Sequence, residues 1–257
     1  KASWTATEAS QLGHDVARAI KLARSGRPGP VHISLPVDLL ESPVDDPGAS
    51  TPTADAFRAP VRAIGHSEAE QLLDAVRGAA RPLFLGGPSL ARDAASELVA
   101  SLAETTRVPV VCMESPRGMN DPSLGAFAEV LPEADLLVLL GKKLDFMLGL
   151  GDPQAVSPTC RIIQVAPEQP APDGPSRSIQ SLVGDPLPAT ELLVALAGER
   201  HWPASGWYDE VRAAVGQKPA EWEAVETASP GPLGAVQVNR AVQAVLEQEF
   251  QEVMVIM

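Results

Sequence analysis

Residues 135–141 read DLLVLLG, with an unbroken apolar run from Leu136 to Leu140. A strand with one face in water alternates apolar and polar residues, whereas this run has no polar position. It therefore predicts a strand buried on both faces, as in a parallel sheet covered by helices on either side. Other β-like runs lie along the chain, at 81–87 (RPLFLGG), 108–114 (VPVVCME), 161–166 (RIIQVA) and 178–185 (SIQSLVGD).

Helical segments are predicted between and after these strands, at 67–79, 89–106, 124–134 and 186–198. A regular alternation of strands and helices is typical of a parallel sheet with right-handed crossovers. We therefore predict an α/β protein with a doubly wound, mostly parallel, six-stranded Rossmann-like sheet and helices on both faces. This domain occupies residues 65–200.

The flanking segments follow another pattern. A helix is predicted within 8–26 and a strand within 30–36, while 41–64 is rich in Pro, Asp, Ala and Thr and predicts a linker. After the central domain, the sequence predicts a connector with a short helix near 207–215, a helix over 235–250 and a strand at 252–257. Since the last strand has no partner in the sequence and Lys1 is not an initiator residue, we expect the chain to be a piece of a longer protein.

Composition excludes several classes of partner. The net charge of −13 disfavours binding to nucleic acid, and the aromatic content of 4% offers few side chains for base stacking. No apolar run approaches the roughly 18 residues that a membrane helix needs. Two cysteines, Cys112 and Cys160, are too few for a disulfide framework. We expect a cytoplasmic protein that binds neither nucleic acid nor a membrane.

Candidate ligand-binding residues follow two of the predicted strands. Parallel sheets bind ligands beyond the carboxyl ends of their strands. Gly86 and Gly87 form a strand-to-helix turn that could admit a phosphate or a sugar, and the alternative is a tight turn without a ligand. In the loop that follows the strand at 135–141, a lysine could bind a phosphate and Asp145 could bind a ribose. The alternative is that these charged side chains are only solvated. The predicted cofactor-binding residues are Gly86, Gly87, Ser89, Gly141, Lys143 and Asp145, with Lys142 as a neighbouring cation.

No catalytic residue and no metal ligand is predicted. The four histidines, His14, His32, His66 and His201, are scattered and have no metal-ligand spacing. The sequence has no GxSxG elbow and no Walker loop. The loop at 114–122 carries Glu114, Arg117 and Asn120, in which Asp121-Pro122 predicts a turn. Cys112 ends a predicted buried strand and is expected to be a structural thiol.

Residues 23–40, ARSGRPGPVHISLPVDLL, closely resemble the end of the pyrimidine-binding domain in thiamine-diphosphate-dependent enzymes. The group nearest in pattern contains acetolactate synthase, oxalyl-CoA decarboxylase and benzoylformate decarboxylase. Further matches in family order are ARPLFLGGPSL (80–90), VPVVCMESPRGMNDPSLG (108–125), ADLLVLLGKKLDF (134–146), RIIQVAPE (161–168), SLVGDPLPATELL (181–193) and the segment from Pro232 to Met257.

The resemblance implies a division of the chain into parts. Residues 1–40 would end the pyrimidine-binding domain, 41–64 would be a linker and 65–200 the central Rossmann-like domain. Residues 201–233 would be a connector, and 234–257 would begin the diphosphate-binding domain.

The resemblance also implies the activity of a longer enzyme. Such an enzyme is a lyase or carboligase that acts on a 2-keto acid or acyl-CoA substrate with thiamine diphosphate and Mg²⁺, as a homodimer or tetramer. Its catalytic glutamate would precede Lys1 and its metal-binding motif would follow Met257, so this fragment is expected to be inactive and to bind neither cofactor.

In this family the central domain holds FAD, ADP or no ligand. Lys143 stands where the flavin enzymes usually have an arginine, and Asp145 matches their aspartate. The stretch SLGAFAEVLPEADLL (123–137) is shorter than its flavin-binding counterparts, which favours ADP or no ligand over FAD. Two other interpretations stay open: a free-standing nucleotide (FAD/ADP)-binding module, and a structural spacer, which is compatible with the enzyme fragment.

Overall fold

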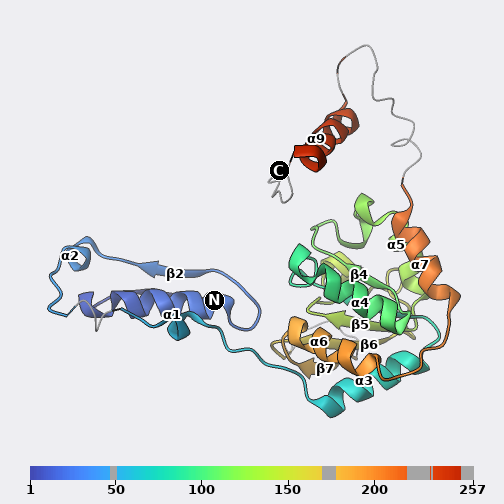
Figure 1. The fold of residues 1–257 in the computed structure, drawn as a ribbon, viewed down its shortest axis with the longest axis horizontal. Helices are drawn as coiled ribbons and strands as arrows, with labels where there is room; N and C mark the ends of the chain where they lie inside the picture. The colour runs from blue at the N-terminus through green and yellow to red at the C-terminus, as the bar shows by residue number, and fades with distance from the viewer. Residues whose placement is uncertain (47–50, 170–177, 219–231, 233, 250–257) are drawn as a thin grey trace.

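The structure is a computed structural model that describes residues 1–46, 51–169, 178–218, 232 and 234–249. It contains a small β–α–β part at the N-terminus and a larger α/β part that follows it (Figure 1). The C-terminal helix, α9 (Ala235–Glu249), forms where the sequence predicts it. The predicted strand at 252–257 lies outside the described residues.

The small part is built on two parallel strands, β1 (Ala2–Thr5) and β2 (Val31–Ser34), which pair with Ala2 opposite Val31. Helix α1 (Leu12–Arg24) connects them, preceded by the 3₁₀ turn η1 (Ala9–Gln11), and the short helix α2 (Val37–Leu40) follows β2. The helix and β2 confirm the expectation from the sequence. Strand β1 was not predicted, because four residues of mixed polarity carry too little periodicity to indicate a strand.

The larger part is a doubly wound parallel sheet with the strand order β4-β3-β5-β6-β7. All four pairings are parallel, and β5 lies at the centre with Leu136 opposite both Pro82 and Arg161. The strands are β3 (Pro82–Gly86), β4 (Val110–Cys112), β5 (Leu136–Leu140), β6 (Arg161–Ala166) and β7 (Gln180–Val183).

The fold class is therefore confirmed, but the predicted count of six strands is wrong. Among the described residues the sheet has five strands, and the two other strands form a separate sheet in the N-terminal part. The reason lies in the sequence between 65 and 200, which has five β-like runs and no sixth run to extend either edge.

Alternate residues of the central strand enter two separate hydrophobic cores. Leu136, Val138 and Leu140 pack on one face of the sheet, while Leu137 and Leu139 pack on the other. All five are buried, which explains why the run has no polar position.

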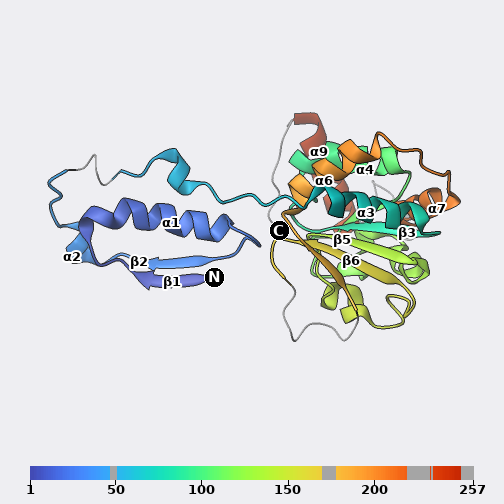
Figure 2. The same cartoon turned by 90° about the horizontal axis from the view of Figure 1, so that it is seen from below.

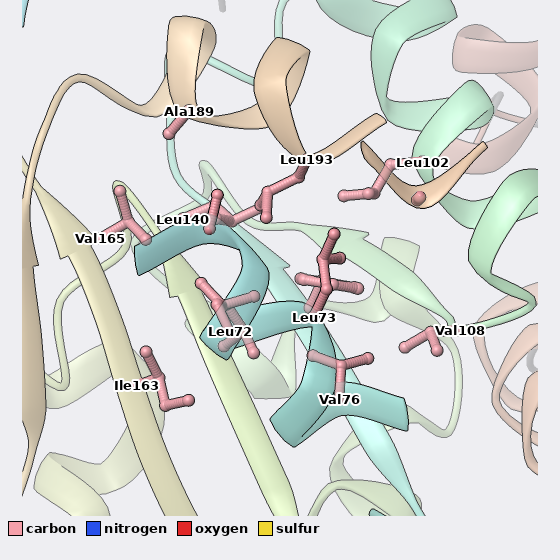
Figure 3. Packing of buried hydrophobic residues seen from close by; sticks show 14 of the residues in the cluster. Leu72, Leu73, Val76, Leu102, Val108, Leu140, Ile163, Val165, Ala189 and Leu193 are labelled. Atoms are coloured by element: carbon pink, nitrogen blue, oxygen red, sulfur yellow. The ribbon is translucent and has the colours of Figure 1, made fainter. Parts of the chain in front are cut away.

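The first core lies under three helices, α3 (His66–Gly78), α4 (Ser96–Thr106) and α6 (Pro186–Ala197). Figure 2 shows these helices on one side of β5 and β6. In Figure 3, side chains from α3 and α6 point toward those of the strands. Labelled members of this core include Leu72, Leu73, Val76, Leu102, Val108, Leu140, Ile163, Val165, Ala189 and Leu193.

Other elements cover the opposite face of the sheet. These are α5 (Phe127–Val130), the 3₁₀ turn η6 (Leu131–Glu133) and α7 (Gly206–Gly216). Trp207 of α7 is buried, and its indole N–H donates a hydrogen bond to the Pro82 carbonyl oxygen at 2.8 Å. The helix expected near 207–215 thus packs back on the domain, as the sequence predicts.

The chain that enters the domain contacts the end of β7. It carries the 3₁₀ turn η2 (Ala54–Phe57), and further along the Arg62 N–H donates to the Asp185 carboxylate at 2.6 Å. The Asp185 N–H donates back to the Arg62 carbonyl oxygen at 2.7 Å. This reciprocal pair ties the entering segment to the carboxyl edge of the sheet.

In the part of the chain that the structure describes, no helix combines the length and the apolar character needed to cross a membrane.

Truncation of Leu193 tests the importance of the first core. Leu193 on α6 is fully buried, whereas Leu187 on the same helix is 39% exposed. We expect Leu193→Ala to lower the free energy of unfolding by about 2–5 kcal/mol, because it leaves a cavity that the packed core fills incompletely. Leu187→Ala, the matched control, should cost less than about 1 kcal/mol. Urea unfolding followed by circular dichroism measures both, and equal losses would contradict the assigned core.

Candidate functional site

The carboxyl ends of β3 and β5 lie side by side at the centre of the sheet. From β3 the chain continues to β4 on one side of this pair, and from β5 it continues to β6 on the other side. In a doubly wound fold, the point where the strand order reverses is where ligands usually bind. The two glycine turns predicted from the sequence both lie at this switch point, and they contact each other.

Backbone contacts join the two turns. The Gly87 N–H donates to the Leu140 carbonyl oxygen at 2.9 Å, and Gly86 forms an isolated antiparallel bridge with Gly141. A Cβ atom on Gly87 would lie 2.6 Å from the Gly141 carbonyl carbon and 3.0 Å from the Lys142 nitrogen. Only glycine allows the two backbone segments to approach so closely.

Neighbouring side chains fill the space around these turns. Gly141 has a φ of +70°, and a Cβ there would lie 2.5 Å from Pro186 Cγ and 3.6 Å from Ser89 Oγ. A Cβ on Gly86 would lie 2.6 Å from Cys112 Sγ. The structure thus brings Gly86, Gly87, Ser89 and Gly141 together. Their role in binding a ligand stays a prediction.

The charged residues after β5 have different environments. Lys142 is 3% exposed, and its Nζ lies 3.2 Å from Asp145 Oδ1 and 3.0 Å from Met147 Sδ. Asp145 Oδ1 also accepts the Met147 N–H at 3.1 Å, which begins the 3₁₀ segment η7 (Phe146–Gly151). Lys143 is exposed. The sequence alone could not tell which of the two adjacent lysines is buried.

A cavity of about 300 Å³ lies beyond the carboxyl end of the edge strand β4. Two 3₁₀ turns, η4 (Gly118–Asn120) and η5 (Pro122–Leu124), form part of its wall. Oxygen-bearing side chains line it beside apolar ones, among them Cys112, Glu114, Ser115, Asp121, Ser123 and Leu124. The sequence analysis named Glu114 in this loop but missed Ser115 and Ser123. The only local signal near them was the turn that Asp121-Pro122 predicts.

The Cys112 thiol is unsuited to nucleophilic chemistry. Burial, with a smaller contribution from the charge of Glu114, raises its pKa to about 11. Since the thiolate is the reactive form, a thiol that stays protonated at neutral pH is a poor nucleophile. Its Sγ instead lies 3.6 Å from the Leu90 carbonyl oxygen. A structural role for this cysteine, expected from the sequence, agrees with these contacts.

Asp121 is held in its charged form by hydrogen bonds. The Ser115 hydroxyl is the main cause that lowers its pKa, followed by the Ser123 N–H, which donates to Asp121 Oδ1 at 2.8 Å. The charge of Arg117 has a smaller effect in the same direction. These bonds fix the loop that bounds the cavity. Asp121 thereby acts as the N-cap of η5.

Within the described ranges, no three His, Cys, Asp or Glu side chains are grouped so that they could hold a metal ion. His32 lies beside Ser3 in the N-terminal part, and His66 lies beside Glu70 at the start of α3. Among the described residues, the carboxyl edge thus offers packing contacts, the partly buried Lys142–Asp145 ion pair and a cavity.

A family model described as "Thiamine pyrophosphate enzyme, central domain" matches residues 69–193, which span the sheet from α3 to α6. Residues 69–193 thus correspond to the central domain of thiamine pyrophosphate enzymes. The resemblance seen in the sequence is thereby confirmed.

Curated relatives agree with this assignment. The chain is 34% identical over 146 residues to a probable 2-ketoarginine decarboxylase of Pseudomonas aeruginosa, an alignment that covers 52% of this chain and 25% of that protein. It is 30% identical over 210 residues to an acetolactate synthase large subunit of Corynebacterium glutamicum, covering 76% of this chain and 32% of that one.

The fold is similar to that of solved thiamine enzymes. The crystal structure of benzoylformate decarboxylase from Polynucleobacter necessarius superposes with a TM-score of 0.66 at 16% identity, over 99% of this chain and 46% of that one. The chain thus spans less than half the length of each of these proteins.

Replacement of the two adjacent lysines tests the buried ion pair. We expect Lys142→Met to lower the free energy of unfolding by about 1–3 kcal/mol, because it leaves the partly buried Asp145 carboxylate without its partner. Lys143→Met, the matched control, should change it by no more than about 0.5 kcal/mol, since this side chain is exposed. Equal effects in urea unfolding would argue against the pair.

A second test uses the hydrogen bonds to Asp121. The ordinary carboxyl pKa is 3.8 and the folded-state value is lower, so the stabilisation from this carboxylate is complete above 3.8 and is lost as the pH falls through the folded value. We expect the stability gap between the unmodified chain and Asp121→Asn to shrink below that pH.

The source of the shift can be checked by carboxyl NMR titration. Ser115→Ala should move the Asp121 pKa toward its ordinary value. Ser123→Ala, which keeps the backbone donor, should move it less. The reverse order would contradict the assigned causes.

Proposed function

We propose that this chain is the central scaffold of a thiamine-diphosphate-dependent lyase or carboligase. The observation that carries the proposal is the family match over residues 69–193, which coincides with the helices and strands of the doubly wound domain. In the full-length enzyme, the reaction would be decarboxylation of a 2-keto acid or carbon–carbon bond formation, with an acyl-CoA as the other substrate class. The enzyme would work in the cytoplasm as a homodimer or tetramer.

The described residues supply no ready-made metal cluster for the diphosphate–Mg²⁺ part of the cofactor. Magnesium beside a diphosphate is usually held by one or two carboxylates together with phosphate oxygens and water. The described part of the chain groups no three acidic, histidine or cysteine side chains so that they could hold a metal ion. We therefore assign no step of the reaction to this chain and expect thiamine diphosphate and Mg²⁺ to be held by other segments of the enzyme.

The role of these residues in catalysis would be mechanical. A sheet whose central strand is buried on both faces is stiff, because interior side chains pack at crystal-like density. Such a layer can keep flanking catalytic domains at a fixed separation, and enzymes lose rate when reacting groups shift by about 1 Å. The interpretations as enzyme fragment and structural spacer are thus one proposal.

The alternative of a free-standing nucleotide-binding module gains no support from the comparisons. The relatives are described as a decarboxylase and a synthase, and the family model is that of an enzyme domain.

The proposal predicts a division of activity between this chain and the full-length gene product. We expect the full-length protein to turn over a 2-keto acid from a panel that includes pyruvate and benzoylformate. Its activity should fall to background after removal of thiamine diphosphate and Mg²⁺ and return when both are added. The 257-residue chain should show no turnover under any of these conditions.

Coupled detection of CO₂ together with product analysis measures both proteins. Full-length turnover that is indifferent to thiamine diphosphate would refute the proposal. So would turnover by the 257-residue chain alone.

A further inference from the structure

A diphosphate at the switch point of a doubly wound fold needs unpaired backbone donors. It usually sits against the N–H groups of a glycine-rich turn that leads directly into a long helix. The turn after β3 and the helix α4 are the parts of this chain that would have to supply them.

The donors of this turn are already used within the protein. The Gly87 N–H donates to Leu140, and the N–H groups of Leu90 and Ala91 both donate to the Gly87 carbonyl oxygen at 2.9 and 3.2 Å. Pro88 has no N–H. Three of the four N–H groups between Gly87 and Ala91 are thus engaged. Helix α4 begins only at Ser96, so its N-terminus does not follow the turn directly.

The space beside the glycines is occupied as well. A glycine that admits a ligand leaves open volume where its Cβ would be, as Gly78 does at the end of α3 with no atom within 4 Å. At Gly86 that volume lies 2.6 Å from Cys112 Sγ, and at Gly87 it lies 2.6 Å from the Gly141 carbonyl carbon. Protein atoms therefore fill the positions that a phosphate or ribose would approach.

Two of the charged side chains near the turn, Lys142 and Asp145, are paired with each other. Their Nζ and Oδ1 atoms lie 3.2 Å apart, and the Lys142 carbonyl oxygen accepts a hydrogen bond from the Gln164 side chain at 3.2 Å. A nucleotide that used Asp145 for its ribose would compete with a cation that is almost fully buried.

We infer that the switch point of this domain is closed by its own backbone, so that Gly86, Gly87 and Gly141 are packing residues and the turn binds no FAD or ADP. This inference goes beyond the proposed function and does not depend on it, because thiamine-dependent turnover and nucleotide binding in this domain are measured separately.

Calorimetric titration of the 257-residue chain with ADP and with FAD tests the ligand side of the inference. We expect no saturable heat with either nucleotide. Saturable binding that Lys143→Gln and Asp145→Asn each weaken about tenfold would overturn the inference, because it would place the nucleotide at the switch point. Saturable binding that neither variant changes would place the nucleotide elsewhere, and the turn would remain closed.

A double-mutant cycle tests the packing side. Gly86→Ala should lower Tm by more than about 4 °C, since the new methyl group meets Cys112 Sγ. Adding Cys112→Ala removes that sulfur and should restore at least half of the loss, a coupling that independent sites do not show. Gly78→Ala is the control and should leave Tm within about 2 °C of the unmodified chain. A double variant no more stable than Gly86→Ala would overturn the packing role.

Discussion

The structure depends on the burial of one strand on both of its faces. Leu136 to Leu140 are at most 1% exposed and contribute alternately to two hydrophobic cores. Each leucine or valine removed from water stabilises the fold by about 1.5–3 kcal/mol. Because both faces must be covered, helices are required above and below the sheet, and the parallel doubly wound arrangement satisfies that requirement.

The same constraint determines what the carboxyl edge can do. With β5 next to β3, Gly141, which directly follows β5, lies against Gly87, which directly follows β3, and the two backbone segments contact each other. Pro186, at the start of α6, then packs on Gly141. The position where many doubly wound proteins bind nucleotides is thus used here to join strands and a helix, which agrees with the proposed role as a scaffold.

The fold was largely predictable from the sequence, whereas the site was predictable only in outline. The run at 136–140 signals its two-sided burial through composition alone, and the buried Trp207 helix has local signals as well. By contrast, the burial of Lys142 rather than Lys143 depends on contacts with Met147 and Gln164 that no local pattern encodes. The contact between Gly86 and Cys112 likewise arises from strand order. The predicted sixth strand was wrong, since residues 65–200 contain five β-like runs and the structure forms one strand from each of them.

Native-state hydrogen exchange tests the central claim most directly. If β5 is the middle strand with both faces buried, the backbone amides of Leu137 to Leu140 exchange only when the whole domain unfolds, and more slowly than those of the edge strands β4 and β7. Exchange of these amides at the rate of the edge strands would show that β5 is not the central buried strand, and the account would fail.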